Sequence, residues 1–148
     1  MDKLRYVVVE GPIGVGKTSL ARRLAARMSA DVLLEQPAEN PFLSRFYRDM
    51  ARYALPTQLF FLFQRLRQIE PLAQADLFAR ATVGDFLLDK DPLFARITLS
   101  ADELALYRKI FESLRPQSPV PDLVIYLQNN TDRLIQHAGL VAERDMRE

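Results

Sequence analysis

The first residues of the chain with a recognisable chemistry form the stretch GPIGVGKTSL, which ends at Leu20. Gly11, Gly16, Lys17 and Thr18 stand at the fixed places of the pattern G-x-x-x-x-G-K-[ST], which binds the phosphates of a nucleotide. Glycines let backbone N–H groups approach phosphate oxygens closely, because no Cβ intervenes. The lysine brings a positive charge to the outer phosphates, and the threonine hydroxyl is placed to bind Mg²⁺.

The neighbours of this loop distinguish it from a chance match on a glycine-rich turn. It follows Tyr6–Glu10, a run of largely β-branched residues that predicts a buried parallel strand. A helix is predicted over Lys17–Met28, and its positive N-terminal end would face a bound anion. We therefore expect a site for the phosphates of a nucleotide, although the loop alone does not name a reaction. Its predicted members are Gly11, Gly14, Val15, Gly16, Lys17, Thr18 and Ser19.

Three further strands are predicted, and they set the fold class. They lie in the ranges 31–37, 81–86 and 122–127, where short apolar runs are bounded by turn residues. Helical patterns separate them, and strands that alternate with helices predict an α/β fold with a parallel sheet and helices on both faces. At 148 residues, the chain is expected to form a single domain over residues 1–148.

The longest helical pattern covers residues 55–69 and is apolar almost all round, which predicts burial on most faces. Its polar exceptions include Gln58 and Arg65, whose spacing puts them on one face. A capping box, formed by Ser100 and Glu103, predicts the start of another helix.

Composition limits the classes of partner. Lys plus Arg number 20 and Asp plus Glu 19, so the chain lacks the basic excess of a general binder of nucleic acid or anionic membranes. It contains no cysteine, which excludes disulfides, thiol catalysis and cysteine-ligated zinc. The longest wholly apolar run, 59–63, is too short to span a bilayer, and the N-terminus lacks the features of a secretory signal. We expect a soluble, cytoplasmic protein with no nucleic-acid or membrane partner.

Longer stretches of the chain resemble the deoxynucleoside kinase family, most closely its bacterial deoxyadenosine/deoxyguanosine kinase branch. The similarity rests on LLEQPAENPFLSRFYRDMARYALPTQLFFLFQRLRQ, GDFLLDKDPLFARITL and PDLVIYL, and extends over about residues 4–128. It implies a P-loop nucleoside/nucleotide kinase fold. It also implies transfer of the γ-phosphoryl group of ATP to the 5′-hydroxyl of a deoxynucleoside, with purines favoured, in nucleotide salvage. Mg²⁺ is the implied cofactor, and a homodimer packed through helices is the implied assembly.

The resemblance implies a role for each matched residue of the acceptor side. Glu35 corresponds to the carboxylate that takes the proton from the 5′-hydroxyl, and Lys17 joins it as the catalytic cation. Tyr47 corresponds to the tyrosine that hydrogen-bonds the sugar 3′-hydroxyl. Gln58 matches the glutamine whose amide reads the base edge, and Arg65 an arginine near the base or the catalytic acid. From the residue types alone, a solvated carboxylate at 35, a core tyrosine at 47 and a surface arginine at 65 stay open.

The chain departs from the family pattern at the third predicted strand. Many members carry acid-Arg-Ser there, whereas this chain has GDF at 84–86 and lacks the arginine. We expect Asp85 to help hold Mg²⁺ with Thr18, against the alternative of a structural aspartate. Lys90 falls where some relatives have an acid that reads the base, and the charges at 89–91 are interpreted as solvated.

After PDLVIYL the family continues with an arginine-rich lid and a last strand, whereas this chain reads QNNTDRLIQHAGLVAERDMRE. We expect the lid and last strand to be missing through omission or truncation. Two other functions stay open. A nucleoside monophosphate kinase related to thymidylate kinases would need more arginines facing the acceptor phosphate. A nucleotide-binding module without catalysis agrees with an incomplete lid but not with Glu35, Gln58 and Thr18.

Overall fold

The computed structural model describes residues 4–12, 15–74 and 80–128. Gly14 of the predicted phosphate loop and the segment 129–148, where the lid was expected to be incomplete, lie outside these residues. The elements are β1 (Tyr6–Glu10), α1 (Lys17–Met28), β2 (Asp31–Leu33), η1 (Pro37–Glu39), α2 (Leu43–Arg48), α3 (Met50–Ile69), η2 (Glu70–Gln74), β3 (Thr82–Gly84), η3 (Leu88–Lys90), α4 (Asp91–Thr98), α5 (Ala101–Leu114), η4 (Arg115–Gln117) and β4 (Leu123–Tyr126), where η denotes a 3₁₀ helix.

The chain forms two compact units. The sheet unit comprises the described parts of Met1–Leu34, Arg80–Phe86 and Pro121–Glu148, and the helical unit those of Glu35–Ala79 and Leu87–Val120. The chain passes from one to the other directly after β2, between Leu34 and Glu35. The single domain expected from the length stays a prediction.

The sheet is parallel, as the alternation of strands and helices predicted. Its strand order is β2-β3-β1-β4, and β1 pairs in parallel with both β3 and β4. In the register, Val8 lies opposite Gly84, while Leu33 at the end of β2 also lies opposite Gly84. Because parallel strands end at the same edge of a sheet, the loop after β1 and the residues after β3 leave the sheet together.

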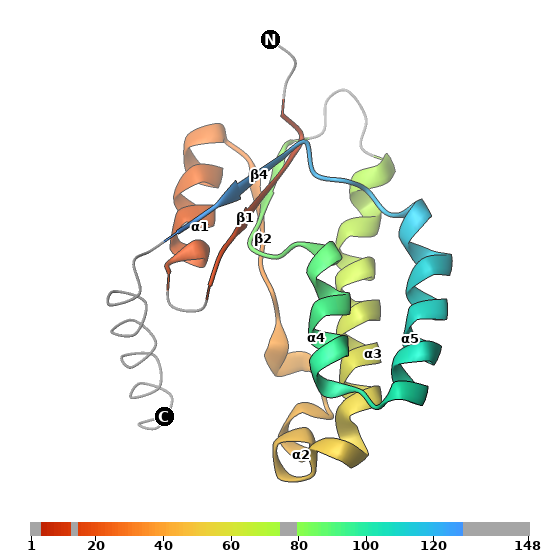
Figure 1. Ribbon diagram of the computed structural model, residues 1–148. Coiled ribbons are helices and arrows are strands. Elements are labelled where there is room, and N and C mark those ends of the chain that lie inside the picture. Colours follow the sequence, from red (N-terminus) through yellow and green to blue (C-terminus); the bar gives the residue numbers. More distant parts are fainter. Residues whose placement is uncertain (1–3, 13–14, 75–79, 129–148) are drawn as a thin grey trace. The chain divides into compact units, whose positions relative to one another are not determined.

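The core of the sheet unit forms between the two inner strands, β1 and β3, and helix α1, which lies against the sheet (Figure 1). Val7 and Val9 of β1 are fully buried, as is Val83 of β3. They pack with Ala21 and Ala25, the buried residues of α1. These small side chains let the helix lie close to the strands, which fixes the position of its N-terminal end relative to β1.

The helical unit is built around α3, which packs against α2, α4 and α5 (Figure 1). α3 begins five residues before the predicted start, because Asp49 caps it by accepting a hydrogen bond from the N–H of Arg52. The helix tolerates Pro56 in its interior. Leu62 is fully buried, whereas Phe63 is 51% exposed, so the expected burial on most faces holds for only part of the helix.

The structure corrects several predicted boundaries. The strands are shorter than the ranges 31–37, 81–86 and 122–127 predicted. The capping box of α5 is confirmed, because Ser100 and Glu103 exchange hydrogen bonds of 3.0 and 3.3 Å between side chain and backbone. No helix in the described part of the chain has the length and apolarity needed to cross a membrane.

Candidate functional site

The described part of the phosphate loop has the geometry that its glycines predict. Gly16 adopts φ 93°, a left-handed conformation that favours glycine, and serves as the N-cap of α1. A Cβ on Gly11 would lie 2.8 Å from the backbone oxygen of Leu127, so a side chain does not fit there. The N–H of Val15 donates to the carbonyl of Pro12 at 3.3 Å. The loop therefore turns tightly from β1 into the N-terminal end of α1.

Lys17, the predicted cation of the loop, is held by a residue that the sequence analysis did not single out. Its Nζ lies 3.3 Å from Oε1 of Glu10, the last residue of β1. The same carboxylate oxygen accepts the backbone N–H of Gly11 at 2.8 Å. The side chain of Lys17 is 24% exposed and that of Glu10 only 5%. The carboxylate is thus buried directly beneath a loop whose chemistry suits anions.

Thr18 and Asp85, the two predicted metal ligands, lie side by side. The Thr18 hydroxyl donates to Oδ2 of Asp85 at 2.8 Å. Asp85 follows β3 directly, and its backbone N–H donates to the carbonyl of Leu33 at 3.1 Å, which fixes its position at the sheet edge. Ser19, the next predicted phosphate ligand, is exposed in the first turn of α1. A hydroxyl and a carboxylate are oxygen donors that Mg²⁺ accepts, usually with phosphates and waters completing its shell.

The helical unit gathers three of the predicted acceptor residues into one cluster. Arg65 lies between two carboxylates: its Nη2 is 3.0 Å from Oε1 of Glu35, and its Nη1 contacts Oδ1 of Asp91. Nε2 of Gln58 donates to Oδ2 of Asp91 at 3.2 Å. The arginine is therefore no free surface side chain, since only 12% of it is exposed. Glu35 is 36% exposed and keeps access to solvent.

Asp91 is the central residue of this cluster, and the sequence analysis missed it. It is 1% exposed and begins α4, a helix that was not predicted. The interpretation of 89–91 as solvated charges is therefore wrong for Asp91, whose carboxylate accepts a hydrogen bond from Gln58. The available sequence signal was Asp-Pro at the start of an apolar segment, which is typical of a helix N-terminus.

Tyr107 of α5 also contacts Asp91, the central residue of this cluster. Its side chain is fully buried, and its hydroxyl donates to Oδ2 of Asp91. Burial raises the pKa of Tyr107 above its ordinary value, and the negative charge of Asp91 raises it further. The ring stacks on Phe111, with centroids 6.1 Å apart. Tyr107 therefore acts as a neutral donor that holds one oxygen of Asp91.

Tyr47 is not brought into this cluster. It lies on α2, is 72% exposed, and its ring contacts that of Phe46 with centroids 5.7 Å apart. This exposure excludes a core role, which was the alternative for Tyr47. The sugar-binding role stays a prediction.

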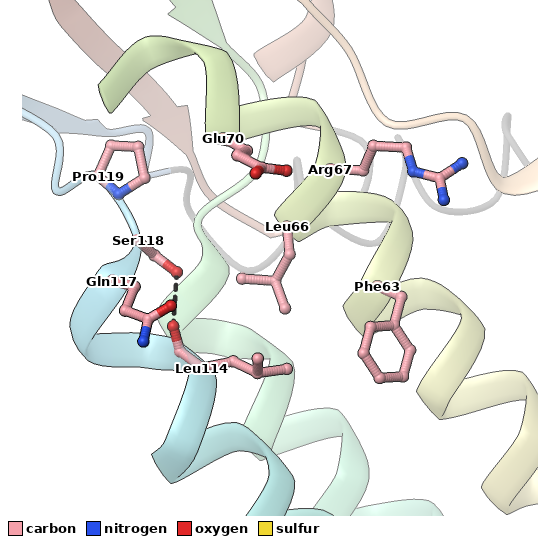
Figure 2. A pocket seen from close by; sticks show the side chains of 8 residues that line it. All are labelled: Phe63, Leu66, Arg67, Glu70, Leu114, Gln117, Ser118 and Pro119. Carbon is pink, nitrogen blue, oxygen red and sulfur yellow. Dashed lines mark hydrogen bonds between the residues drawn. The ribbon is translucent and has the colours of Figure 1, made fainter. Parts of the chain in front are cut away.

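Two cavities in the helical unit differ in what lines them. A small one of about 50 Å³ touches the cluster, with Glu35, Phe61 and Arg65 in its wall. Phe61 also lies against the Arg65 guanidinium, 5.1 Å from ring centre to Cζ. A larger cavity of about 330 Å³ lies where α3 and α5 end, and it contains none of the predicted site residues (Figure 2). The larger cavity is lined by Phe63, Leu66, Arg67, Glu70, Leu114, Gln117, Ser118 and Pro119.

The chain is similar in sequence to known proteins. A family model described as deoxynucleoside kinase matches residues 7–140. The chain is 31% identical over 136 residues to a deoxyguanosine kinase of Bacillus subtilis (strain 168), covering 91% of this chain and 66% of that protein. It is 29% identical over 147 residues to a deoxyadenosine/deoxycytidine kinase of the same organism, covering 91% and 64%. The chain thus spans slightly less than two thirds of the length of these relatives.

Solved structures share the fold. A deoxyadenosine kinase from M. mycoides with dCMP and dCDP bound superposes with a TM-score of 0.75 at 19% identity, covering 91% of this chain and 70% of that one. The same enzyme with bound dATP gives a TM-score of 0.75. The parallel sheet and its helices are therefore those of a P-loop kinase fold. Since the family model spans well over half of the sequence, this chain belongs to the deoxynucleoside kinase family.

Proposed function

We propose that this protein transfers the γ-phosphoryl group of ATP to the 5′-hydroxyl of a deoxynucleoside, with a purine base favoured, in nucleotide salvage. The observation that carries the proposal is the cluster in which Arg65 joins Glu35 to Asp91 and Asp91 holds Gln58. It provides a carboxylate with solvent access next to an oriented amide, which suits an alcohol attached to a hydrogen-bonding base. The curated relatives, which are deoxyguanosine and deoxyadenosine/deoxycytidine kinases, support the same acceptor class.

On the donor side, the phosphate loop supports ATP as the co-substrate. The N-terminal end of α1 and the backbone N–H groups of the loop would face the phosphates, and Lys17 would bond their outer oxygens. The Thr18 hydroxyl and Oδ2 of Asp85, which lie 2.8 Å apart, form a set of oxygen ligands that fits Mg²⁺. When bound, the ion offsets negative charge on the phosphates.

On the acceptor side, each residue would have a separate task. Glu35 would accept the proton of the 5′-hydroxyl, which typically contributes about 10²–10⁴ in rate. Arg65 would orient that carboxylate through the 3.0 Å contact. Gln58 offers both a donor and an acceptor to a base edge, and Asp91 fixes which way its amide points. Tyr47, exposed on α2, would reach the sugar 3′-hydroxyl.

We also propose a homodimer that forms through the helical unit. Phe63 of α3 is 51% exposed and Leu106 of α5 is 49% exposed, and α3 packs directly against α5. A dimer packed through these helices would cover exposed apolar side chains of this kind. Light scattering of the purified protein tests this: a mass of twice 17.0 kDa supports the dimer, and a monomer refutes it.

Turnover of radiolabelled ATP against a panel of nucleosides and nucleoside monophosphates tests the main proposal. We expect deoxynucleosides to accept the label and become labelled monophosphates. If only the added monophosphates accept the label and become labelled diphosphates, the protein is a nucleoside monophosphate kinase. ATP binding without transfer would identify a module without catalysis.

Glu35→Gln then tests the assigned base. The amide keeps the size of the side chain but cannot take the proton, so kcat should fall about 10²–10⁴-fold with little change in KM. Glu39→Gln is a matched control, because Glu39 is an exposed carboxylate four residues on that bonds Gln64 at 3.0 Å. A raised nucleoside KM with unchanged kcat would show that Glu35 only binds the substrate.

A further inference from the structure

Glu10 places a buried negative charge at the entrance of a loop suited to anions. The residue is 3% exposed and ends β1 directly before Gly11. One carboxylate oxygen bonds both the Gly11 N–H at 2.8 Å and Lys17 Nζ at 3.3 Å. A donor and a cation of the loop are thus both engaged by one carboxylate of the protein itself.

This arrangement makes Lys17 serve two anions once a nucleotide is bound. A lysine ammonium has three donors, so it can bond Glu10 and a phosphate oxygen at the same time. The attraction of Lys17 for the phosphates would then be shared with Glu10. The Glu10 carboxylate would also repel the phosphates, and its burial reduces the screening of that repulsion by solvent.

A role confined to shaping the loop would not need a charge. The Gly11 N–H needs only an acceptor, which an amide oxygen supplies equally well. Elsewhere in the sheet unit, Oδ2 of Asp122 accepts the N–H groups of Arg5 and Tyr6 at 2.9 Å each and braces the start of β1 in this way. The Glu10 carboxylate accepts a backbone N–H in the same way, but it also forms an ion pair with Lys17 of the phosphate loop.

We propose that Glu10 is a positioning residue that holds Lys17 in place in the ligand-free protein and weakens nucleotide binding, which favours release of the diphosphate product. The inference rests on the proposed nucleotide site at the loop. It assigns Glu10 two effects on Lys17. The first is a fixed position for its ammonium, and the second is competition with the phosphates for its charge.

Glu10→Gln tests the competition, because the amide can still accept the Gly11 N–H but carries no charge. Calorimetric titration of the full chain with ADP should show binding about tenfold tighter than in the wild type, the change expected when a nearby like charge is removed. The matched control is Asp122→Asn, which neutralises a backbone-bonding carboxylate away from the loop and should leave ADP affinity unchanged. Equal or weaker ADP binding by Glu10→Gln would overturn the inference. Failure of the wild type to bind ADP would instead refute the proposed nucleotide site.

A second measurement tests the fixed position in the wild type and does not depend on how the variant folds. The sequence has four lysines, Lys3, Lys17, Lys90 and Lys109, so ¹H–¹⁵N spectra of the ammonium groups are simple. The signal lost in Lys17→Arg identifies Lys17. We expect this signal to be protected from exchange without ligand and to shift when ADP saturates the site. A Lys17 ammonium in free exchange with water in the ligand-free protein would overturn the inference.

Discussion

Asp91→Asn removes one negative charge from the middle of the acceptor cluster and keeps the size of the side chain. In the wild type, this carboxylate is 1% exposed and accepts from Arg65, from the Tyr107 hydroxyl and from Gln58 Nε2. An asparagine offers one acceptor oxygen and turns an NH₂ group toward the remaining donors. At least one of the three donors then loses its partner. Arg65, which contacts two carboxylates in the wild type, keeps only the contact with Glu35.

The expected magnitude follows from burial. Removing one partner of a buried ion pair costs about 3–5 kcal/mol, because the other charge is left uncompensated. Arg65 is 12% exposed and retains Glu35 at 3.0 Å, so we expect the low end of that range, about 3 kcal/mol. Asp89→Asn is the control from the same segment. Asp89 pairs with Arg115 at 2.5 Å but is 49% exposed, and exposed pairs contribute only about 0–1 kcal/mol.

Urea unfolding followed by circular dichroism measures the stability of both variants, and steady-state kinetics measures their KM values. Asp91→Asn should lower the unfolding midpoint well below that of Asp89→Asn without changing the slope. Its KM for the nucleoside should rise, because Gln58 is no longer oriented, while its KM for ATP should not change. The reasoning is refuted if the two variants are equally stable, or if both KM values rise together.

Three further outcomes are expected. Lys17→Ala should abolish turnover in a folded protein, because a cation worth several kcal/mol in the transition state is lost, and near-normal turnover would contradict the phosphate-loop assignment. Gln58→Leu should weaken nucleoside binding by about 1–3 kcal/mol and leave ATP binding unchanged, so equal loss for both ligands in calorimetry would mark Gln58 as structural. Folding raises the pKa of Tyr107, so the stability linked to its protonated form is complete below about pH 10 and is lost as the pH rises further. Tyr107→Phe should therefore lose less stability than the wild type between pH 9 and 11 in urea titrations; identical pH profiles would contradict this.

The arrangement of the phosphate loop in the sheet unit could be predicted from the sequence because its residues are neighbours in the chain. Gly11 and Gly16 lie in the turn between β1 and α1, Lys17 and Thr18 begin α1, and the motif predicts this arrangement from its spacing. The position of Asp85 beside Thr18 followed from a rule about parallel sheets. Asp85 comes directly after β3, Thr18 follows the loop after β1, and the carboxyl ends of parallel strands lie at the same edge of the sheet. Local pattern and topology together were enough for these residues, but they did not indicate that Glu10 would bond Lys17.

The cluster around Arg65 in the helical unit depends on contacts between residues far apart in the sequence. The Arg65–Asp91 contact spans 26 positions, the Glu35–Arg65 contact 30 and the Gln58–Asp91 contact 33. Residue types and helical spacing indicated that Gln58 and Arg65 share a face, but they carried no information about what that face meets. The segment after β3 had to be placed in space before Asp91 could be recognised as its partner.

The error at Asp91, which was interpreted as a solvated charge, turned on a single position in the chain. Lys90 ends η3 and Asp91 begins α4, and successive residues in a helix point about 100° apart, so a shift of one position changes which side chain faces α3. The segment DKDP reads as a solvated charge cluster because charged residues are seldom fully buried without partners. Here three donors from two other helices, Gln58, Arg65 and Tyr107, supply those partners. The burial of Asp91 depends on these three partners, which come from distant parts of the chain. Its position at the centre of the cluster therefore could not be predicted from the local sequence.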